Sequence, residues 1–306
     1  KEDREILVEM YGTEYEQGEI CERGYAFFSR AWKEMEFHCV KLEEVCRQKD
    51  AEFLGILNDI KYGRNLQNVI AYLESNQSSD LMEEAPYLVG TNSKADKINQ
   101  AHMRDLDEKT EKKFWAIIEG DVTYEDIKNI SFAKQSLVVN IGAKVMLTAN
   151  DTNGEYVNGT MGTIIDISKE RGDATCIQVL TDKGKKVDVY RYEREIERQD
   201  IEEREEKDEN GKTVIAKKIV RKIVGSFKQF PIKIAWAISI HKSQGQTFGQ
   251  VNIDPRCWDS GQFYVAVSRA ESIAGIHFLT PIMKQYIRTL SDEVIKILEN
   301  SLKVIE

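Results

Sequence analysis

A short polar segment, His241–Thr247 (HKSQGQT), directly follows an apolar run and is the first place where side chains are suited to chemistry. In open α/β sheets, ligands bind at the carboxyl ends of the strands. Lys242 and Ser243 suit phosphate contacts, and Gln244 suits contact with a nucleotide. Gly245 lets the backbone approach a ligand closely. We therefore predict a ligand site here; a solvated loop is the alternative that composition leaves open.

Arg269 is the second candidate, in the segment Gly261–Ala270. Read as a helix, this segment places Arg269 away from a buried stripe made of Phe263, Val267 and Ala270. A guanidinium held on a rigid helix can be aimed at a phosphoryl group, and such an arginine finger is worth roughly 10³–10⁵ in rate where it completes a site. The alternative is a surface arginine in an ion pair.

The segments around both candidates alternate between helices and strands, which is typical of an α/β sheet. Asp50 is predicted to cap a helix with apolar positions Phe53, Ile56, Leu57 and Ile60, and a second helix repeats that spacing at Leu66, Val69, Ile70 and Leu73. A strand at Tyr87–Gly90 is followed by a predicted capping box, Ser93–Asp96, that opens a helix through about Met103. Further strands are predicted at Ile232–Ile240, with its isoleucines on one face, and at Val251–Ile253.

The region from about Leu137 to Phe230 has a different pattern, with short alternating strands and turn signals. Asn158-Gly159, Asp182-Lys183-Gly184 and Asn210-Gly211 mark three of the turns. Strands at this spacing predict a small β-barrel inserted between two α/β segments.

Composition excludes some classes of protein. The 306 residues are 41% apolar and hold no apolar stretch long enough for a membrane span. The first five residues are charged and resemble no secretory signal, and five scattered cysteines fit a reducing compartment and argue against structural zinc. We expect a cytoplasmic or nuclear protein without a metal site formed by its own residues. The net charge of −9 speaks little against nucleic acid, because residues 193–209 carry six of the nine negative charges.

Read together, the two candidate segments resemble a known family. Ala235–Phe248 (AWAISIHKSQGQTF) resembles motif V, and Gly261–Glu271 (GQFYVAVSRAE) resembles motif VI, of superfamily 1B DNA helicases of the petite-integration-frequency and RecD-like family. Leu42–Gly63 is similar to the motif IV region, although the family usually has Phe where this chain has Cys46. Val138–Gly162 is similar to the Src-homology-3-like barrel that the family inserts into its second RecA-like domain.

The resemblance implies a fold and a domain order. It implies an α/β, RecA-like second helicase domain of the P-loop NTPase type in two parts, residues 42–136 and 231–306, with a small β-barrel inserted at 137–230. Residues 1–41 resemble the tail of the first RecA-like domain.

The same resemblance implies roles for individual residues. Arg269 matches the arginine finger, and Arg47 matches the motif IV arginine that reaches the γ-phosphate. The residues expected near the nucleotide are Gln244, Gly245 and Thr247. The residues expected along single-stranded DNA are His241, Lys242, Ser243, Thr91 and Asn92. ATP and Mg²⁺ are the implied cofactors, and single-stranded DNA and the DNA fork are the implied partners, with 5′→3′ polarity.

The other half of an ATP site is absent from the sequence. No Gly-x-x-x-x-Gly-Lys-[Ser/Thr] motif occurs, so the loop that would cradle the phosphates is missing. The expectation is that the chain is the C-terminal part of a longer helicase, that a first RecA-like domain is its partner, and that it does not hydrolyse ATP alone.

Two alternatives and one feature stay open. The chain could instead serve as a non-catalytic nucleic-acid or protein-binding module, or as a RecD-type subunit of a recombination nuclease. The charged hairpin at residues 193–222 is either a solvated ribbon with cross-strand ion pairs or an element that acts at strand separation.

Overall fold

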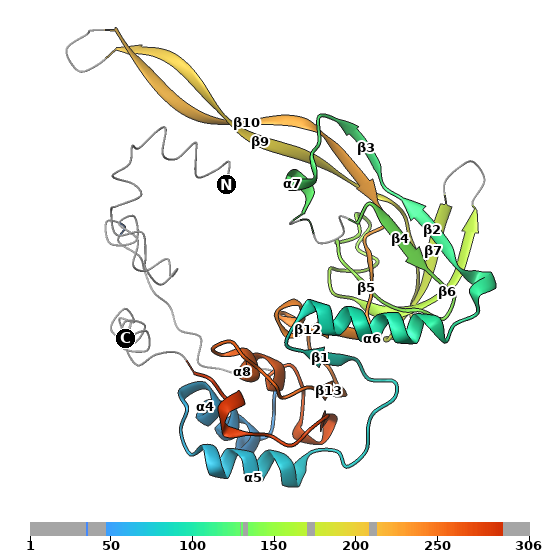
Figure 1. Ribbon diagram of the computed structural model, residues 1–306, viewed down its shortest axis with the longest axis vertical. Helices are drawn as coiled ribbons and strands as arrows, with labels where there is room; N and C mark the ends of the chain where they lie inside the picture. Colours follow the sequence, from blue (N-terminus) through green and yellow to red (C-terminus); the bar gives the residue numbers. More distant parts are fainter. Residues whose placement is uncertain are drawn as a thin grey trace.

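The computed structural model describes Met35 and residues 47–128, 130, 134–169, 175–207 and 213–289. Two parts are distinguished in Figure 1: an α/β part, residues 47–107 and 235–289, and a β-rich part, residues 108–234, from which a long hairpin projects. Apart from Met35, the predicted tail of a first domain at 1–41 lies outside the described residues, as do Cys46 and Asn210-Gly211. Within the described ranges, no helix has the length and apolar character that crossing a bilayer requires.

The α/β part is built on a parallel four-stranded sheet. Its strands lie in the order β12 (Ala237–Ser239), β1 (Tyr87–Val89), β13 (Val251–Ile253) and β14 (Ile276–Phe278). All four carboxyl ends therefore meet at one edge of the sheet, which we call the carboxyl edge. This edge is where an open parallel sheet binds ligands.

Helices cover both faces of this sheet. Side chains alternate between the faces along a strand, so Leu88 of β1 packs in one core while Val89 packs in another. The Leu88 side is covered by α4 (Ala51–Tyr62), α5 (Leu66–Asn76) and α8 (Gln262–Val267), and the Val89 side by α6 (Asn92–Arg104). This three-layer arrangement confirms the α/β prediction.

The predicted helices follow their apolar spacing. All four expected positions of α4, Phe53, Ile56, Leu57 and Ile60, are buried, and the Asp50 carboxylate caps the helix by accepting from the backbone N–H groups of Glu52 and Phe53. The predicted capping box at Ser93–Asp96 is wrong. The helix begins earlier, because Thr91 is its N-cap and its hydroxyl accepts from the N–H of Lys94.

The single strand predicted at Ile232–Ile240 is also wrong. The chain forms two short strands, β11 (Ile232–Ile234) and β12, separated by Ala235 and Trp236. β11 pairs with β5 (Lys144–Leu147) of the β-rich part, whereas β12 joins the parallel sheet. The run is apolar along its whole length because it passes from one hydrophobic core into the other.

The β-rich part holds three antiparallel sheets. The largest has five strands in the order β11, β5, β6 (Met161–Lys169), β7 (Thr175–Thr181) and β8 (Lys186–Val189), and it encloses its own apolar core. A second pairs β2 (Lys112–Trp115) with β4 (Ser136–Val139). The third contains β3 (Ile117–Gly120), β10 (Thr213–Gln229) and β9 (Tyr192–Lys207) in that order. Strands at residues 112–120 thus precede the predicted start of the insert at 137.

The β9–β10 hairpin projects away from both parts (Figure 1). Its base is fixed where β3 pairs with β10 in an antiparallel arrangement. A Cβ on Gly225 would lie 2.0 Å from the carbonyl oxygen of Glu119, so only glycine allows the two strands to approach this closely. Beside the crossing, Phe227 and Ile196 pack with Ile127 of the short helix α7 (Tyr124–Ile127).

Candidate functional site

The polar segment after β12 presents some of its side chains to solvent and keeps others inside. Residues Ile240–Ser243 form a 3₁₀ turn in which His241 and Lys242 are exposed. Ser243 is fully buried, and its hydroxyl donates to the carbonyl oxygen of Ile240 at 2.7 Å. Gly245 has φ +85°, a left-handed conformation that favours glycine. In this structure the loop therefore offers His241 and Lys242 to a ligand, while the Ser243 hydroxyl holds the turn.

Arg47 lies against the end of this loop, although 200 residues separate it from Thr247. Its Nε donates to Thr247 Oγ1 at 2.9 Å, and its Nη1 donates to the carbonyl oxygen of Ser268 at 2.9 Å. The neighbouring Gln48 is buried and donates to the carbonyl oxygens of both Ser268 and Ala270. The segment before α4 is thus fastened to the segment after α8.

Arg269 lies in the turn just beyond α8, because that helix ends at Val267; the prediction that a helix carries it is wrong. Its guanidinium is part-buried and donates to the carbonyl oxygen of Val265, to Ser268 Oγ at 3.0 Å and to the carbonyl oxygen of Gln246. Burial lowers the pKa of Arg269, and the nearby positive charge of Arg47 lowers it further.

The two guanidinium groups therefore lie together with neutral hydrogen-bond partners. Among the described residues, neither Arg47 nor Arg269 forms an ion pair with a carboxylate. Beside Arg47 is a 790 Å³ open cavity lined by Arg47, Lys49, Asp50, Thr247, Glu271 and Ser272. Arg47 and Lys49 bring positive charge to its wall and Asp50 and Glu271 bring negative charge, whereas Arg269 lies behind Arg47 and does not line it. Two nearby guanidinium groups that bond only neutral oxygens repel each other, and a bound anion would offset that repulsion.

A second site lies at the carboxyl edge of the sheet. Thr91 and Asn92 follow β1 and are both exposed at the start of α6. Asn92 and Lys242 line the same open groove of 730 Å³, which runs between α6 and strands β4 and β11 of the β-rich part. The structure thus brings two of the predicted DNA-binding residues together, at a place distinct from the arginine pair.

Searches for known relatives give a consistent answer. No protein-family model matches the chain. The ATP-dependent DNA helicase Pif1 of Bdellovibrio bacteriovorus is 31% identical over 84% of this chain and 54% of that protein, and the Pif1 helicase of Campylobacter jejuni is 29% identical over 80% and 54%. The crystal structure of Bacteroides Pif1 with ADP-AlF4 has a TM-score of 0.68 at 26% identity, covering 98% of this chain and 63% of that one. Bacteroides Pif1 bound to single-stranded DNA has a TM-score of 0.63 at the same identity, covering 98% and 62%.

The chain is similar to the Pif1 helicases over most of its own length. It spans about half the length of the curated bacterial Pif1 proteins that it matches. The structural neighbours share its RecA-like α/β architecture.

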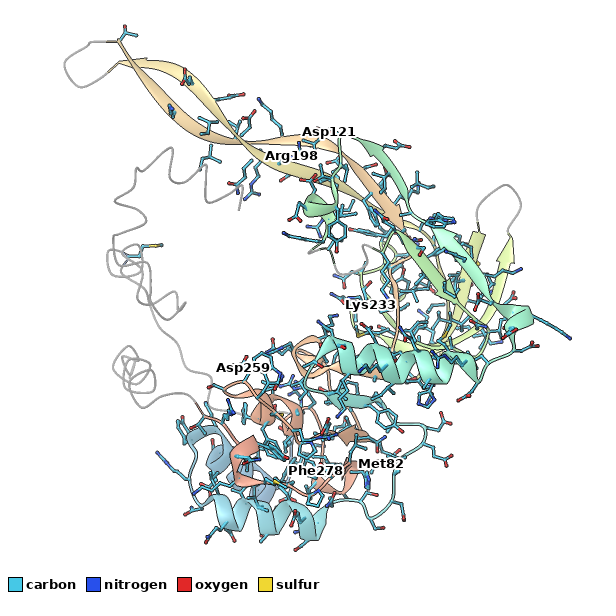
Figure 2. The ribbon with its side chains drawn as sticks, viewed as in Figure 1. Met82, Asp121, Arg198, Lys233, Asp259 and Phe278 are labelled. Atoms are coloured by element: carbon cyan, nitrogen blue, oxygen red, sulfur yellow. The ribbon has the colours of Figure 1, made fainter. Side chains whose placement is uncertain are left out.

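This Pif1-like chain has functional candidates that its sequence did not reveal. Lys233 and Lys134 line the groove with Lys242. Burial, together with repulsion from Lys242 and Lys134, lowers the pKa of Lys233 to about 8. The only sequence signal was a lysine inside the apolar run Ile232–Ile240. Figure 2 marks Lys233 close to α6, where the α/β part and the β-rich part meet.

Gln246 joins the two parts of the Pif1-like chain at the arginine site. A Cβ on Gly159 would lie 1.6 Å from Gln246 Nε2, and Gly159 has φ +92°. The left-handed φ favours glycine at this turn, which lies against the side chain of Gln246 in the loop that contacts Arg269. Among the described residues, no cluster of three or more His, Cys, Asp or Glu side chains is arranged to hold a metal ion.

Proposed function

We propose that this chain supplies the second RecA-like domain of an ATP-dependent 5′→3′ DNA helicase. The observation that carries the proposal is the pair Arg47–Arg269, two nearby guanidinium groups that bond neutral oxygens, with Arg47 on the wall of an open cavity. The helicase activity of the related Pif1 proteins supports it.

The arginine pair is proposed to contact the γ-phosphate of ATP. Arg269 acts as the arginine finger and Arg47 as a second contact, with Gln244, Gly245 and Thr247 beside the nucleotide. Bound anionic phosphate would offset the repulsion between the two cations, so nucleotide draws the domains together and hydrolysis releases them. Since the sequence has no Walker A motif, we propose that ATP and Mg²⁺ are bound mainly by another RecA-like domain and that this chain alone does not turn over ATP.

Single-stranded DNA is proposed to lie along the carboxyl edge and the adjoining groove, and the fork is the proposed larger substrate. Thr91, Asn92, His241 and Lys242 contact its phosphates, and the predicted contact through Ser243 becomes a positioning role, because its hydroxyl holds the turn. Phosphate contacts of this kind supply most of the affinity for DNA. Lys134 and Lys233 are added to the set, since they share the groove with Asn92 and Lys242.

We further propose that the five-stranded sheet of the β-rich part is the small Src-homology-3-like barrel of the family. The domain division at 42–136, 137–230 and 231–306 goes with it. The pairing of β2 with β4 favours a boundary nearer to Glu111 than to 137.

The test is an Arg269→Ala variant of the full-length helicase that contains this chain. DNA-stimulated ATP hydrolysis should fall by roughly 10³-fold or more, while affinity for a fluorescent single-stranded oligonucleotide stays within about twofold. Arg64→Ala is the matched control, because Arg64 is an exposed arginine that lies over the Tyr62 ring. Loss of DNA binding in step with loss of turnover would instead make Arg269 a residue of the fold or of the DNA site.

A further inference from the structure

Trp258 presents a large apolar ring to solvent at the carboxyl edge. Its side chain is 55% exposed, in the loop between β13 and α8. Free exposure of an indole is unfavourable, and a surface tryptophan near a ligand edge is often a contact for that ligand.

The position of this ring is fixed from three directions. The indole Nε1 donates to the carbonyl oxygen of Gly90 at 3.3 Å. The backbone N–H of Trp258 donates to Gln262 Oε1 at 3.1 Å, and its carbonyl oxygen accepts from Arg288 Nη1 at 2.8 Å. A ring held in this way loses little conformational freedom when a ligand binds to it.

Trp258 also lies between the two segments proposed to hold DNA phosphates. Gly90, which accepts from the indole, directly precedes Thr91. On the other side, Asp259 Oδ2 lies 3.7 Å from His241 Nε2. Figure 2 marks Asp259 at the upper left of the α/β part, near α8. A single strand whose phosphates contact both segments would pass with its bases over this ring.

Charged groups of both signs surround the ring. The buried carboxylate of Asp254, at the end of β13, is shared by Lys94 and Arg256, so two cations surround one anion. Asp259 is the opposing charge, and it faces His241. Sequence-tolerant binding of single strands combines basic grooves with aromatic rings on which bases stack.

We propose that Trp258 is a nucleobase-stacking residue for single-stranded DNA. The proposal rests on the proposed function, because it requires that DNA follow the carboxyl edge. Stacking of one base on an aromatic ring changes affinity by roughly 5- to 150-fold on alanine substitution. Because every base has a flat aromatic face, the contact should be indifferent to base identity.

The experiment compares Trp258→Ala, Trp258→Phe and Trp115→Ala by fluorescence anisotropy with a labelled oligothymidylate and with an abasic strand of equal length. One salt concentration is used throughout, because phosphate contacts are salt-dependent. Trp115 is the matched control: it is also a tryptophan, 61% exposed, but lies on β2 of the β-rich part. Thermal melts confirm that each variant is folded.

We expect Trp258→Ala to weaken binding of the oligothymidylate by about tenfold and to leave binding of the abasic strand unchanged. Trp258→Phe should retain most of the affinity, and Trp115→Ala should resemble the wild type. The oligonucleotide should also quench tryptophan fluorescence in the wild type and far less in Trp258→Phe.

Two failures are distinguishable. A wild-type chain that binds the oligothymidylate, with a folded Trp258→Ala variant that binds it equally well, overturns the stacking role alone. A folded wild-type chain that binds neither strand overturns the proposed function, and the stacking role with it. Equal weakening on both strands would make Trp258 a support for the loop and contradict stacking.

Discussion

Two groups of arginines in this molecule are held in opposite ways. In the α/β part, Arg47 and Arg269 lie together and bond only neutral oxygens among the described residues. At the base of the hairpin, Arg198 is bonded to two carboxylates: its Nη2 lies 2.8 Å from Asp126 Oδ2, and its Nη1 lies 3.2 Å from Asp121 Oδ2 (Figure 2).

The pKa values of Arg198 and Arg269 are shifted in opposite directions. The hydrogen bond to Asp126 raises the pKa of Arg198, and the same bond lowers the pKa of Asp126 well below its usual range. Burial and Arg47 lower the pKa of Arg269. A paired arginine stabilises the fold, whereas a part-buried arginine without a counterion is destabilised until an anion arrives. The comparison therefore distinguishes an arginine that stabilises the fold from arginines that are suited to bind an anionic ligand.

The largest expected difference is between Arg47→Ala and Arg198→Ala. Arg47→Ala should lower DNA-stimulated ATP hydrolysis of the full-length helicase by roughly 10³-fold and leave Tm unchanged or higher, since it relieves repulsion with Arg269. The Ser268 carbonyl keeps its bond from Gln48. Arg198→Ala should lower Tm and keep turnover close to wild type. Kinetics and calorimetry on both variants measure this, and a large loss of Tm in Arg47→Ala would remove the distinction.

A second difference concerns Lys233, another basic residue whose pKa is lowered by its surroundings. With a pKa of about 8, Lys233 is mostly charged at pH 7 and mostly neutral at pH 9. A phosphate bound to it favours the charged form, so affinity for single-stranded DNA should fall by about tenfold between pH 7 and pH 9 in excess of the Lys233→Met variant. Oligonucleotide titrations at three pH values check this. Parallel pH curves for the two proteins would exclude Lys233 from the DNA site.

The same lysine makes a prediction for stability. Its pKa in the folded chain is lower than the usual value, so the unfolded state binds more protons between about pH 8 and pH 10.4. The cost of burying the charge is therefore fully present below pH 8 and declines as pH rises through that range. Lys233→Met should raise Tm at pH 7, and this gain should shrink above pH 8.

A smaller effect is expected from Asp126→Asn. The lowered pKa of Asp126 means that its carboxylate stabilises the fold above about pH 4, the usual range of a carboxyl, and that this stability is lost as pH falls further. The variant should melt a few degrees lower at pH 7 and show a flatter fall of Tm below pH 4. Asp121→Asn is the control, because that side chain is 86% exposed and should matter less. Identical acid profiles for Asp126→Asn and the wild type would contradict the role of the pair.

The sequence predicted what local chemistry determines. Apolar spacing and the Asp50 cap predicted α4. The family resemblance predicted that Arg47 and Arg269 face one site, and in the structure both arginines bond to Ser268; their roles stay a prediction. Alternating isoleucines could not reveal that residues 232–240 leave one sheet for another, because both environments are apolar.

Features set by distant contacts could not be predicted either. Gln48 bonds carbonyl groups about 220 residues away, and the pKa of Lys233 depends on lysines from other segments. Ser243 looked available for phosphate contact because a hydroxyl in a polar loop carries no sign of whether it faces inward.

The smallest effect is expected at the hairpin itself, where charged side chains form ion pairs across the two strands. Along the ribbon the acidic strand β9 pairs with the basic strand β10, and ion pairs join Lys222 with Asp200 at 2.5 Å and Arg221 with Glu197 at 3.7 Å. These cations are already neutralised, and exposed pairs contribute little. Reversing one pair, as Asp200→Lys with Lys222→Asp, keeps the attraction but moves the positive charge to the other strand.

Such a double variant should match the wild type in Tm, DNA affinity and unwinding, within experimental error. Lys222→Asp alone removes the cation bonded to Asp200 and adds a second carboxylate near it, so this variant is the control for a disturbed ribbon. If the double variant unwinds a fork more slowly although its Tm is unchanged, then the position of positive charge on β10 matters, and the hairpin acts on DNA where the strands separate. Equal unwinding would favour a solvated ribbon whose ion pairs stabilise the hairpin. The arginines of the α/β part, which bond no carboxylate among the described residues, would then be the ones suited to bind an anionic ligand.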